Sequence, residues 1–178
     1  MAVSSVSQQG SLQMKPGVFT QLYVHVVFSP KYRERLLAKE IRGEIFSYMS
    51  GILTNRGHKS IIINGMADHA HILFGENPND KLSDLVGCIK RESSVFINGK
   101  GWFRGSFHWQ DGYGAFSYGR SQLDTVYKYI ANQEEHHRIR TFREEYTELL
   151  NAFAIKYDDK YLFEFFDDAD ESRIVGQP

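Results

Sequence analysis

The stretch that decides the fold is KSIIINGMADHAHILF, residues 59–74. It holds two β-branched, apolar runs, Lys59–Gly65 and residues 69–74, with only three residues between them, a spacing typical of a tight β-hairpin. Strand alternation in the second run places His69 and His71 on one face of the sheet and the apolar residues on the other. Two imidazoles on one face make a metal site feasible, although one structural and one exposed histidine would fit the same pattern.

The segments on either side of this hairpin predict the rest of the fold. A β-branched and aromatic run over residues 18–28 stops at Pro30, which cannot continue a sheet ladder, so it reads as a first, interior strand. Apolar residues at helical spacing follow over residues 40–55. The later pattern predicts a helix capped by Asn79 or Asp80 and ending at Gly99, a strand within residues 107–118, a helix from Ser121 whose Asp124 completes a capping box, and a last helix from Thr141 to about Phe153. This order is the split β-α-β pattern, so we expect an α+β fold, a ferredoxin-like antiparallel sheet with helices packed on one face.

The length and composition fit a single domain. The 178 residues are 42% hydrophobic and 14% aromatic, which is enough to bury a core. We divide the chain into a disordered leader or expression remnant at residues 1–16, one domain at 17–157, and an acidic C-terminal tail at 158–178. With neither a secretory signal nor an apolar run long enough to span a bilayer, the expected location is the cytoplasm. The single cysteine, Cys88, excludes an internal disulfide.

The net charge of −1 conceals an uneven distribution along the chain. Residues 158–178 hold seven acidic and two basic residues, which leaves residues 1–157 with 19 basic and 15 acidic ones. A charge of +4 over that longer segment is compatible with contacts to phosphate groups.

The helix predicted after Ser121 carries two tyrosines in LDTVYKYIANQ, residues 123–133. Tyr127 lies within the apolar stripe of this helix, so we expect it in the core. Tyr129 falls about 100° off that stripe, and Gln133 lies one turn further along the same flank. The flank can hold a nucleophile beside a metal ligand; the alternative is a surface tyrosine over a surface glutamine.

Together these features resemble the single-tyrosine HUH transposases of the IS200-like family, which move insertion sequences as single-stranded DNA. The resemblance runs from about residue 17 to 166 and rests on several stretches in family order. They are FTQL at 19–22, DHAH at 68–71, WQDGY at 109–113 and YIANQEEHH at 129–137. One departure is Ala70, which is smaller than the bulky aliphatic residue usual between the two histidines.

The resemblance implies roles for the residues at the matching positions, within an HUH-type catalytic domain at 17–157. His69, His71 and Gln133 would bind a divalent metal, Mg²⁺ or Mn²⁺, and Tyr129 would be the nucleophile. The implied activity is that of a DNA transposase, a strand transferase that cleaves and rejoins single-stranded DNA at hairpin-containing element ends through a 5′-phosphotyrosine. The resemblance also implies a homodimer in which the histidines of one subunit and the tyrosine helix of the other share each site.

The chemistry of these residue types agrees with the implied roles. A bound divalent cation offsets the charge that builds on a phosphodiester during attack, and two imidazoles with an amide oxygen leave coordination positions open. A phenol with a pKa of about 10 is a poor nucleophile at neutral pH, so Tyr129 needs the metal or a nearby base. His136, about two helical turns after Tyr129, is one candidate base, with a solvated histidine as the alternative.

Candidates for holding single-stranded DNA combine aromatic rings with cations. They are Lys90, Arg91, Arg104, Trp109 and Tyr113. For the rings the alternative is a place in the core, and for the cations it is a solvated helix face. Two other functions stay open: a metal-dependent nuclease in which Tyr129 has no part, and a noncatalytic single-stranded nucleic-acid-binding module that keeps only the fold.

Overall fold

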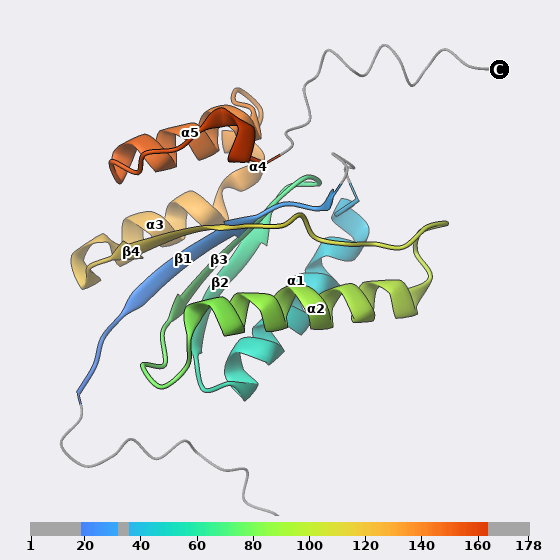
Figure 1. Cartoon of the computed structure of the whole chain (residues 1–178), viewed down its shortest axis with the longest axis horizontal. Helices are drawn as coiled ribbons and strands as arrows, with labels where there is room; N and C mark the ends of the chain where they lie inside the picture. Colours follow the sequence, from blue (N-terminus) through green and yellow to red (C-terminus); the bar gives the residue numbers. More distant parts are fainter. Residues whose placement is uncertain (1–18, 32–35, 164–178) are drawn as a thin grey trace, which may run out of the picture.

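A four-stranded antiparallel sheet in the order β2-β3-β1-β4 forms the centre of the molecule (Figure 1). The computed structural model of the chain describes residues 19–31 and 36–163. The strands are β1 (Tyr23–Phe28), β2 (Lys59–Gly65), β3 (Ala70–Gly75) and β4 (Gly114–Tyr118). This strand order is that of a ferredoxin-like sheet, so the predicted α+β class and antiparallel sheet are confirmed.

Two long helices cover one face of the sheet. They are α1 (Lys39–Asn55) and α2 (Leu82–Lys100). Their buried side chains recur at helical spacing, with Ile45, Met49 and Ile52 on α1, and they pack against Ile72 and Phe74 of β3 in the main core. The apolar face of β3 therefore meets these two helices, as strand alternation predicts.

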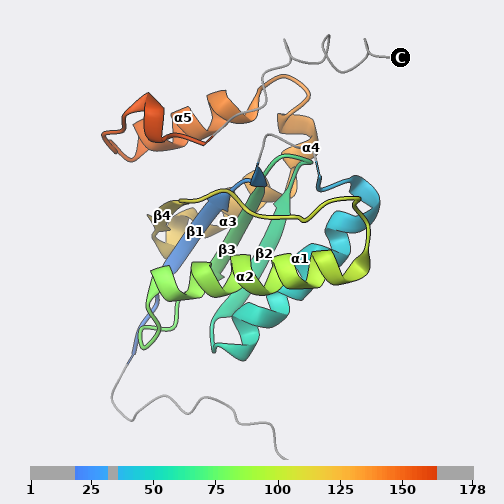
Figure 2. The same ribbon diagram turned by 45° about the vertical axis from the view of Figure 1, so that its right-hand side comes forward.

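The C-terminal helices lie on the opposite face, so the expectation of helices on one face only is incomplete (Figures 1 and 2). They are α3 (Leu123–Ala131), α4 (Gln133–His136) and α5 (Phe142–Ala152), with 3-10 turns at Arg120–Gln122 and Asp159–Tyr161. Leu73, which alternates with the apolar core residues of β3, packs on Val126 and Ile130 of α3. An antiparallel sheet can leave one face to solvent, but here the second face is apolar at Leu73 and is covered by α3. Among the described residues, none of the helices has the length and hydrophobicity that a bilayer crossing needs.

The hairpin forms where the sequence predicts it, and it depends on a close approach at Gly65. Gly65 pairs with Ala70, and a Cβ atom on Gly65 would lie 2.2 Å from the carbonyl oxygen of His69. Only glycine fits this position, because the obstructing atoms belong to the backbone. The first strand is interior, as predicted, since β1 pairs with both β3 and β4.

Two predicted helix caps differ from those in the structure. Asp80 does not cap α2, because its carboxylate accepts hydrogen bonds from Arg56 at 2.7 Å and lies 3.0 Å from His58 Nε2. Ser121 does not cap α3 either, because α3 follows the 3-10 turn at Arg120–Gln122 directly and has no side-chain cap. Within that turn, Gln122 Oε1 accepts the backbone N–H of Gly119 at 3.0 Å. The capping box predicted from Thr141 is present at the start of α5.

The packed part of the chain continues beyond residue 157. Phe163 is buried, and its ring lies 4.7 Å from that of Tyr146 and 5.9 Å from that of Phe142. The first part of the acidic tail thus covers α5 of its own chain. The leader expected at residues 1–16 and the tail after Phe163 lie outside the described residues.

Candidate active site

Two buried histidines from β3 form the floor of the site. His69 immediately precedes β3 and His71 lies within it, and neither side chain is exposed to solvent. Their rings lie 4.9 Å apart. The Nε2 atoms face the same carboxylate oxygen, Glu145 Oε2, at 3.5 Å from His69 and 3.3 Å from His71. The prediction that both imidazoles share one face of the sheet is therefore confirmed.

Each of these histidines is oriented through its other ring nitrogen. His69 Nδ1 donates to Asp68 Oδ1 at 2.7 Å, and His71 Nδ1 shares a hydrogen bond of 2.8 Å with His25 Nε2. A carboxylate or similar partner on Nδ1 is the usual arrangement behind a histidine that binds metal through Nε2. Burial lowers the pKa of His71 and lowers that of His25 well below its ordinary value, which favours the neutral imidazole at these two positions. Burial acts in the same direction on His69, but the hydrogen bond and charge of Asp68 and the charge of Glu145 raise its net pKa.

The role of His25 was missed by sequence reasoning. It alternates with valines in β1 and belongs to none of the motifs. Its side chain meets His71 only because β1 and β3 pair in the register that sets His25 opposite Leu73. His25 is fully buried and lies on the same face of the sheet as His69 and His71. Its role could be inferred only once the register of β1 and β3 was known.

Gln133 and Tyr129 reach the histidines from the helices on the opposite side of the site. Gln133 begins α4 and is fully buried, with Oε1 at 3.1 Å from His69 Nε2. Tyr129 on α3 is half-buried, and its ring lies 5.8 Å from that of His71. The Tyr129 hydroxyl donates to Glu145 Oε1. The structure thus brings together the residues predicted as ligands and as nucleophile.

The prediction for the neighbouring tyrosine is wrong. Tyr127 is 46% exposed and is not part of the core, because α3 buries Val126 and Ile130 against β3 and turns its next residue outward. The apolar cluster between α3 and the sheet is narrow: its buried members are Leu73, Val126 and Ile130, and Tyr127 lies outside it.

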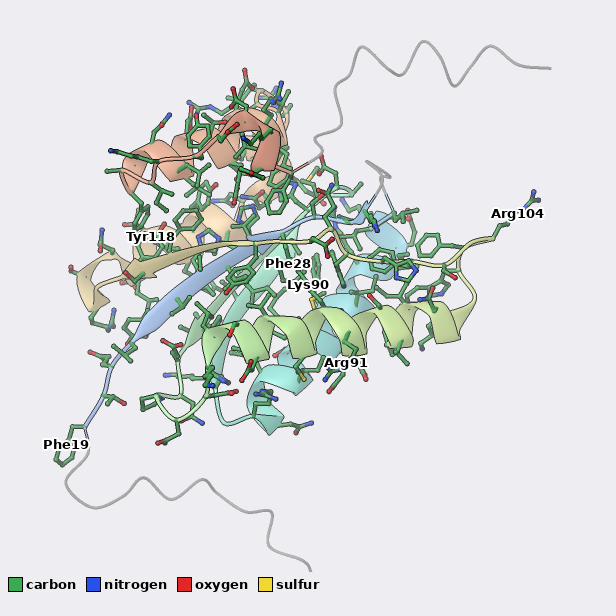
Figure 3. The ribbon with its side chains drawn as sticks, in the orientation of Figure 1. Phe19, Phe28, Lys90, Arg91, Arg104 and Tyr118 are labelled. Carbon is green, nitrogen blue, oxygen red and sulfur yellow. The ribbon has the colours of Figure 1, made fainter. Side chains whose placement is uncertain are left out.

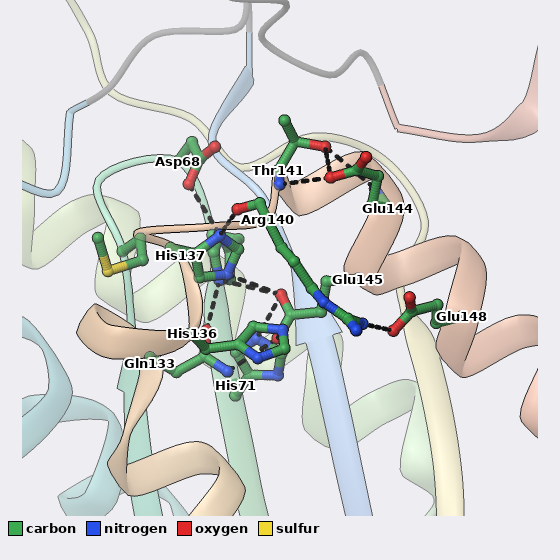
Figure 4. A network of polar contacts seen from close by, with 12 residues as sticks. Asp68, His71, Gln133, His136, His137, Arg140, Thr141, Glu144, Glu145 and Glu148 are labelled. Carbon is green, nitrogen blue, oxygen red and sulfur yellow. Dashed lines mark hydrogen bonds and ion pairs between the residues drawn. The ribbon is translucent and has the colours of Figure 1, made fainter.

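Glu145 of α5 lies at the centre of the network and was not singled out by the sequence (Figure 4). Its side chain is buried, and its Oε1 accepts from Gln133 Nε2 at 2.8 Å as well as from Tyr129. Its Oε2 lies 2.9 Å from His137 Nε2. Burial by itself raises the pKa of this carboxyl, but the charge of His71 and the hydrogen bond of His137 hold the net pKa below its usual value. The signal in the sequence was a carboxylate between Phe142 and Tyr146, on the apolar face of an amphipathic helix.

The candidate base His136 lies beside the tyrosine without bonding to its hydroxyl. The two rings are 5.3 Å apart in an edge-to-face arrangement and His136 Nε2 is 3.6 Å from Glu145 Oε1. Burial lowers the pKa of His136. The hydrogen-bond acceptor in contact with Tyr129 is therefore Glu145.

Comparison with known proteins assigns the chain to a family. A family model described as "Transposase IS200 like" matches residues 18–133, nearly two thirds of the sequence, including His69, His71, Tyr129 and Gln133. The chain belongs to the IS200-like transposase family. The expected family is thereby confirmed, and the protein is a transposase by descent.

Individual relatives of this transposase agree with the family model. The ISDra2 transposase TnpA of Deinococcus radiodurans is 26% identical over 133 residues, which cover 70% of this chain and 94% of that protein. The transposase for insertion sequence element IS200 of Salmonella typhimurium is 27% identical over 116 residues, covering 62% of this chain and 76% of that one.

Solved structures share the fold of the transposase. A crystal structure of a Deinococcus radiodurans protein described as a transposase has a TM-score of 0.53 at 22% identity, and the match covers 68% of this chain and 98% of that one. A REP-associated tyrosine transposase bound to a REP hairpin has a TM-score of 0.50 at 13% identity, with 89% of this chain and 94% of that one covered.

The predicted DNA-binding residues are not brought to the active site. Lys90 and Arg91 lie on α2, on the other face of the sheet from Tyr129, and Arg104 follows that helix in a loop (Figure 3). Lys90 donates to the backbone carbonyl oxygens of two residues in the loop before β4, at 2.8 Å for the first of them. Trp109 is buried, and its Nε1 donates to a core serine at 2.8 Å.

The outcome for these five candidates is therefore divided. Trp109 has the core position that was its alternative, and Lys90 tethers a loop. Arg91 and Arg104 are exposed, and Tyr113 is half-buried along the groove between α2 and the loop. The two arginines and Tyr113 stay predictions for contact with nucleic acid.

Proposed function

We propose that this transposase is a metal-dependent strand transferase that cleaves and rejoins single-stranded DNA through a 5′-phosphotyrosine at Tyr129. The observation that carries the proposal is the convergence of the Tyr129 hydroxyl, the Nε2 atoms of His69 and His71, and the amide nitrogen of Gln133 around one buried carboxylate. The amide oxygen of Gln133 lies 3.1 Å from His69 Nε2. A structural cluster would not need a phenol, two imidazoles and an amide that all face the same point.

The residues fit a divalent metal. His71 Nε2 is buried and has no hydrogen-bond partner among the described residues, although buried polar atoms nearly always have one. His69, His71 and Gln133 would hold the ion, and two nitrogens with one oxygen suit Mn²⁺ or Mg²⁺. When bound, such an ion offsets the negative charge that develops on the phosphate and on the leaving oxygen.

Tyr129 supplies the nucleophilic oxygen. Burial, and then the adjacent carboxylate, raise the pKa of its hydroxyl above the ordinary value, so the phenol keeps its proton until a substrate arrives. The Tyr129 oxygen then bonds to phosphorus and gives its proton to Glu145 Oε1, the acceptor of its hydrogen bond. The bond from phosphorus to the 3′-oxygen breaks, and this oxygen takes up a proton and leaves as a free 3′-hydroxyl. The phosphotyrosine conserves the energy of the broken bond, so a 3′-hydroxyl can attack it and rejoin the strand.

The site is assembled from residues of one chain. This arrangement supports catalysis within a single subunit, whereas the resemblance implies a homodimer with shared sites. An exchange of tyrosine helices between two subunits would rebuild the same contacts in trans. Mixing a Tyr129→Phe variant with a His69→Ala variant tests the difference, because only a shared site recovers activity in the mixture.

The substrate we propose is single-stranded DNA from the flanks of the gene, with hairpin-forming ends. One solved relative is bound to a REP hairpin, and the exposed Arg91 and Arg104 could contact phosphates. We expect cationic and aromatic side chains to hold this DNA along the groove between α2 and the loop before β4, which includes Tyr113.

The experiment is a covalent-adduct assay with 3′-labelled single-stranded DNA and Mn²⁺ or Mg²⁺. A 5′-phosphotyrosine retains the fragment on the 3′ side of the cut, so the label should move with the protein on a denaturing gel. Tyr129→Phe should abolish the adduct. The matched control Tyr127→Phe alters an exposed phenol on the same helix and should leave the adduct intact.

The two alternative functions give different results in the same assay. If the protein is a metal-dependent nuclease, both variants would cut the DNA without forming an adduct. A noncatalytic binding module would retard the DNA on a native gel and leave it uncut with either metal.

A further inference from the structure

Glu145 comes from a part of the chain that the family match does not include. The matched region ends at residue 133, and Glu145 lies in the middle of α5, Phe142–Ala152. The two histidines, Gln133 and Tyr129 fall inside the match. The role of Glu145 is therefore to be sought in the geometry of this chain.

The two oxygens of the Glu145 carboxylate face different partners (Figure 4). Oε1 accepts from the Tyr129 hydroxyl and from the amide of Gln133. Oε2 lies 3.3 Å from His71 Nε2 and 3.5 Å from His69 Nε2. One potential ligand atom from Glu145 and one from each histidine all lie within 4.8 Å of one another.

Glu145 is held in this position by packing on both sides of α5. Phe142, one turn earlier, stacks on the ring of His69 with centroids 4.2 Å apart and planes 4° from parallel. Tyr146 packs over Gly114 of β4, where a Cβ atom would lie 2.8 Å from its ring. Because α5 is fixed against the histidine and against the sheet, the carboxylate is directed into the site and not into solvent.

We propose that Glu145 is a further ligand of the metal site, with Oε2 facing the ion and Oε1 holding the Tyr129 hydroxyl. The inference rests on the proposed function, since it requires that His69 and His71 bind a metal. It adds an anionic oxygen to two neutral nitrogens and an amide oxygen. Hard divalent cations favour such oxygens, and the shared carboxylate ties the nucleophile to the ion.

Two observations separate this proposal from a purely structural role. His71 Nε2 is buried without a hydrogen bond and faces Glu145 Oε2, an arrangement that leaves the nitrogen lone pair available to an ion. Glu145 is also buried. Within the described part of the chain its ion-pair partners are four histidines at or beside the metal site, and no lysine or arginine pairs with it.

The test is a measurement of Mn²⁺ affinity by isothermal titration calorimetry on the full chain, without DNA. Glu145→Gln keeps the size of the side chain and its ability to accept a hydrogen bond from Tyr129. We expect this variant to bind Mn²⁺ at least about tenfold more weakly than the wild type. The control Glu148→Gln alters an exposed carboxylate of the same helix, paired with Arg140, and should stay within about twofold.

The outcomes distinguish this proposal from the proposed function. If Glu145→Gln binds Mn²⁺ as the wild type does while His71→Ala does not bind it, Glu145 is no ligand and the metal site stands. If His71→Ala also binds normally, the metal site itself is refuted, and this inference falls with it.

A crystal structure of the wild type with Mn²⁺ keeps the proposal testable if Glu145→Gln does not fold. The anomalous signal would locate the ion, and we expect a Glu145 oxygen within about 2.5 Å of it. An ion on His69 and His71 with Glu145 turned away would overturn the proposal.

Discussion

Gly65→Ala should destabilise the fold at the end of β2, where the hairpin leads to His69 and His71. The added Cβ would lie 2.2 Å from the carbonyl oxygen of His69 and 2.9 Å from Cα of Ala70. Carbon and oxygen in contact need more than 3 Å, so the end of β2 must move by roughly 1 Å from β3. Neither obstructing atom can rotate away, since both belong to the backbone. Overpacking of this kind costs about 1–3 kcal/mol.

Urea unfolding followed by circular dichroism, in EDTA to exclude metal, measures the effect. With an m value of about 2 kcal/mol per molar urea, the midpoint should fall by about 0.5–1.5 M. The matched control is Gly51→Ala on α1, where a Cβ meets nothing within 4 Å. Its midpoint should rise by about 0.5 M, because alanine favours the helix by about 1 kcal/mol.

An unchanged midpoint for Gly65→Ala, with the expected rise for Gly51→Ala, would refute the reasoning. It would mean that the hairpin tolerates a side chain where the backbones approach. A lower midpoint should be accompanied by weaker Mn²⁺ binding, because His69 moves with the strand.

Three further predictions concern interactions away from the tyrosine. Hydrogen bonds from Arg56 lower the pKa of Asp80 to about 2. The stability that this carboxylate contributes is therefore complete above pH 4 and is lost as the pH falls from 4 to 2. Urea unfolding between pH 2 and 7 should show that Asp80→Asn removes about 1–2 kcal/mol of this pH dependence. Lys90→Met should lower the urea midpoint through the loss of its bonds to loop carbonyls and leave single-stranded DNA affinity within about twofold; a loss of affinity at unchanged stability would restore its DNA-binding role. Thr141→Ala removes the capping box with Glu144 and should cost about 1 kcal/mol; an unchanged midpoint would contradict that role for the cap.

Much of the fold was predictable because its signals are local. Alternation over residues 59–74 predicted the hairpin and the shared face of His69 and His71, and both are present. The capping box from Thr141 predicted the start of α5 correctly. The predicted caps of α2 and α3 were wrong, because the Asp80 carboxylate is bonded to Arg56 and because α3 follows a 3-10 turn directly and has no side-chain cap.

The burial of individual side chains was less predictable. Tyr127 follows the apolar stripe of α3 in sequence but is exposed, since the cluster on that face of β3 is narrow. Trp109 was proposed for DNA contact and is buried beside Phe28 and Phe107. Periodicity identifies which face of a helix is apolar. The width of the surface that packs against this face depends on the rest of the chain.

The amino-acid sequence by itself determined the elements, the histidine face, the tyrosine helix and the family, because each depends on residues within a few positions of one another or on motifs in order along the chain. The tertiary structure alone decided that His25 orients His71, 46 residues away, that Gln133 meets His69 across 64 residues, and that Glu145 lies at the centre of the site. Those contacts follow from strand register and from the packing of α5 against the sheet. Such packing depends on complementary surfaces of elements that are far apart in the sequence, so it cannot be inferred from the spacing of residues along the chain.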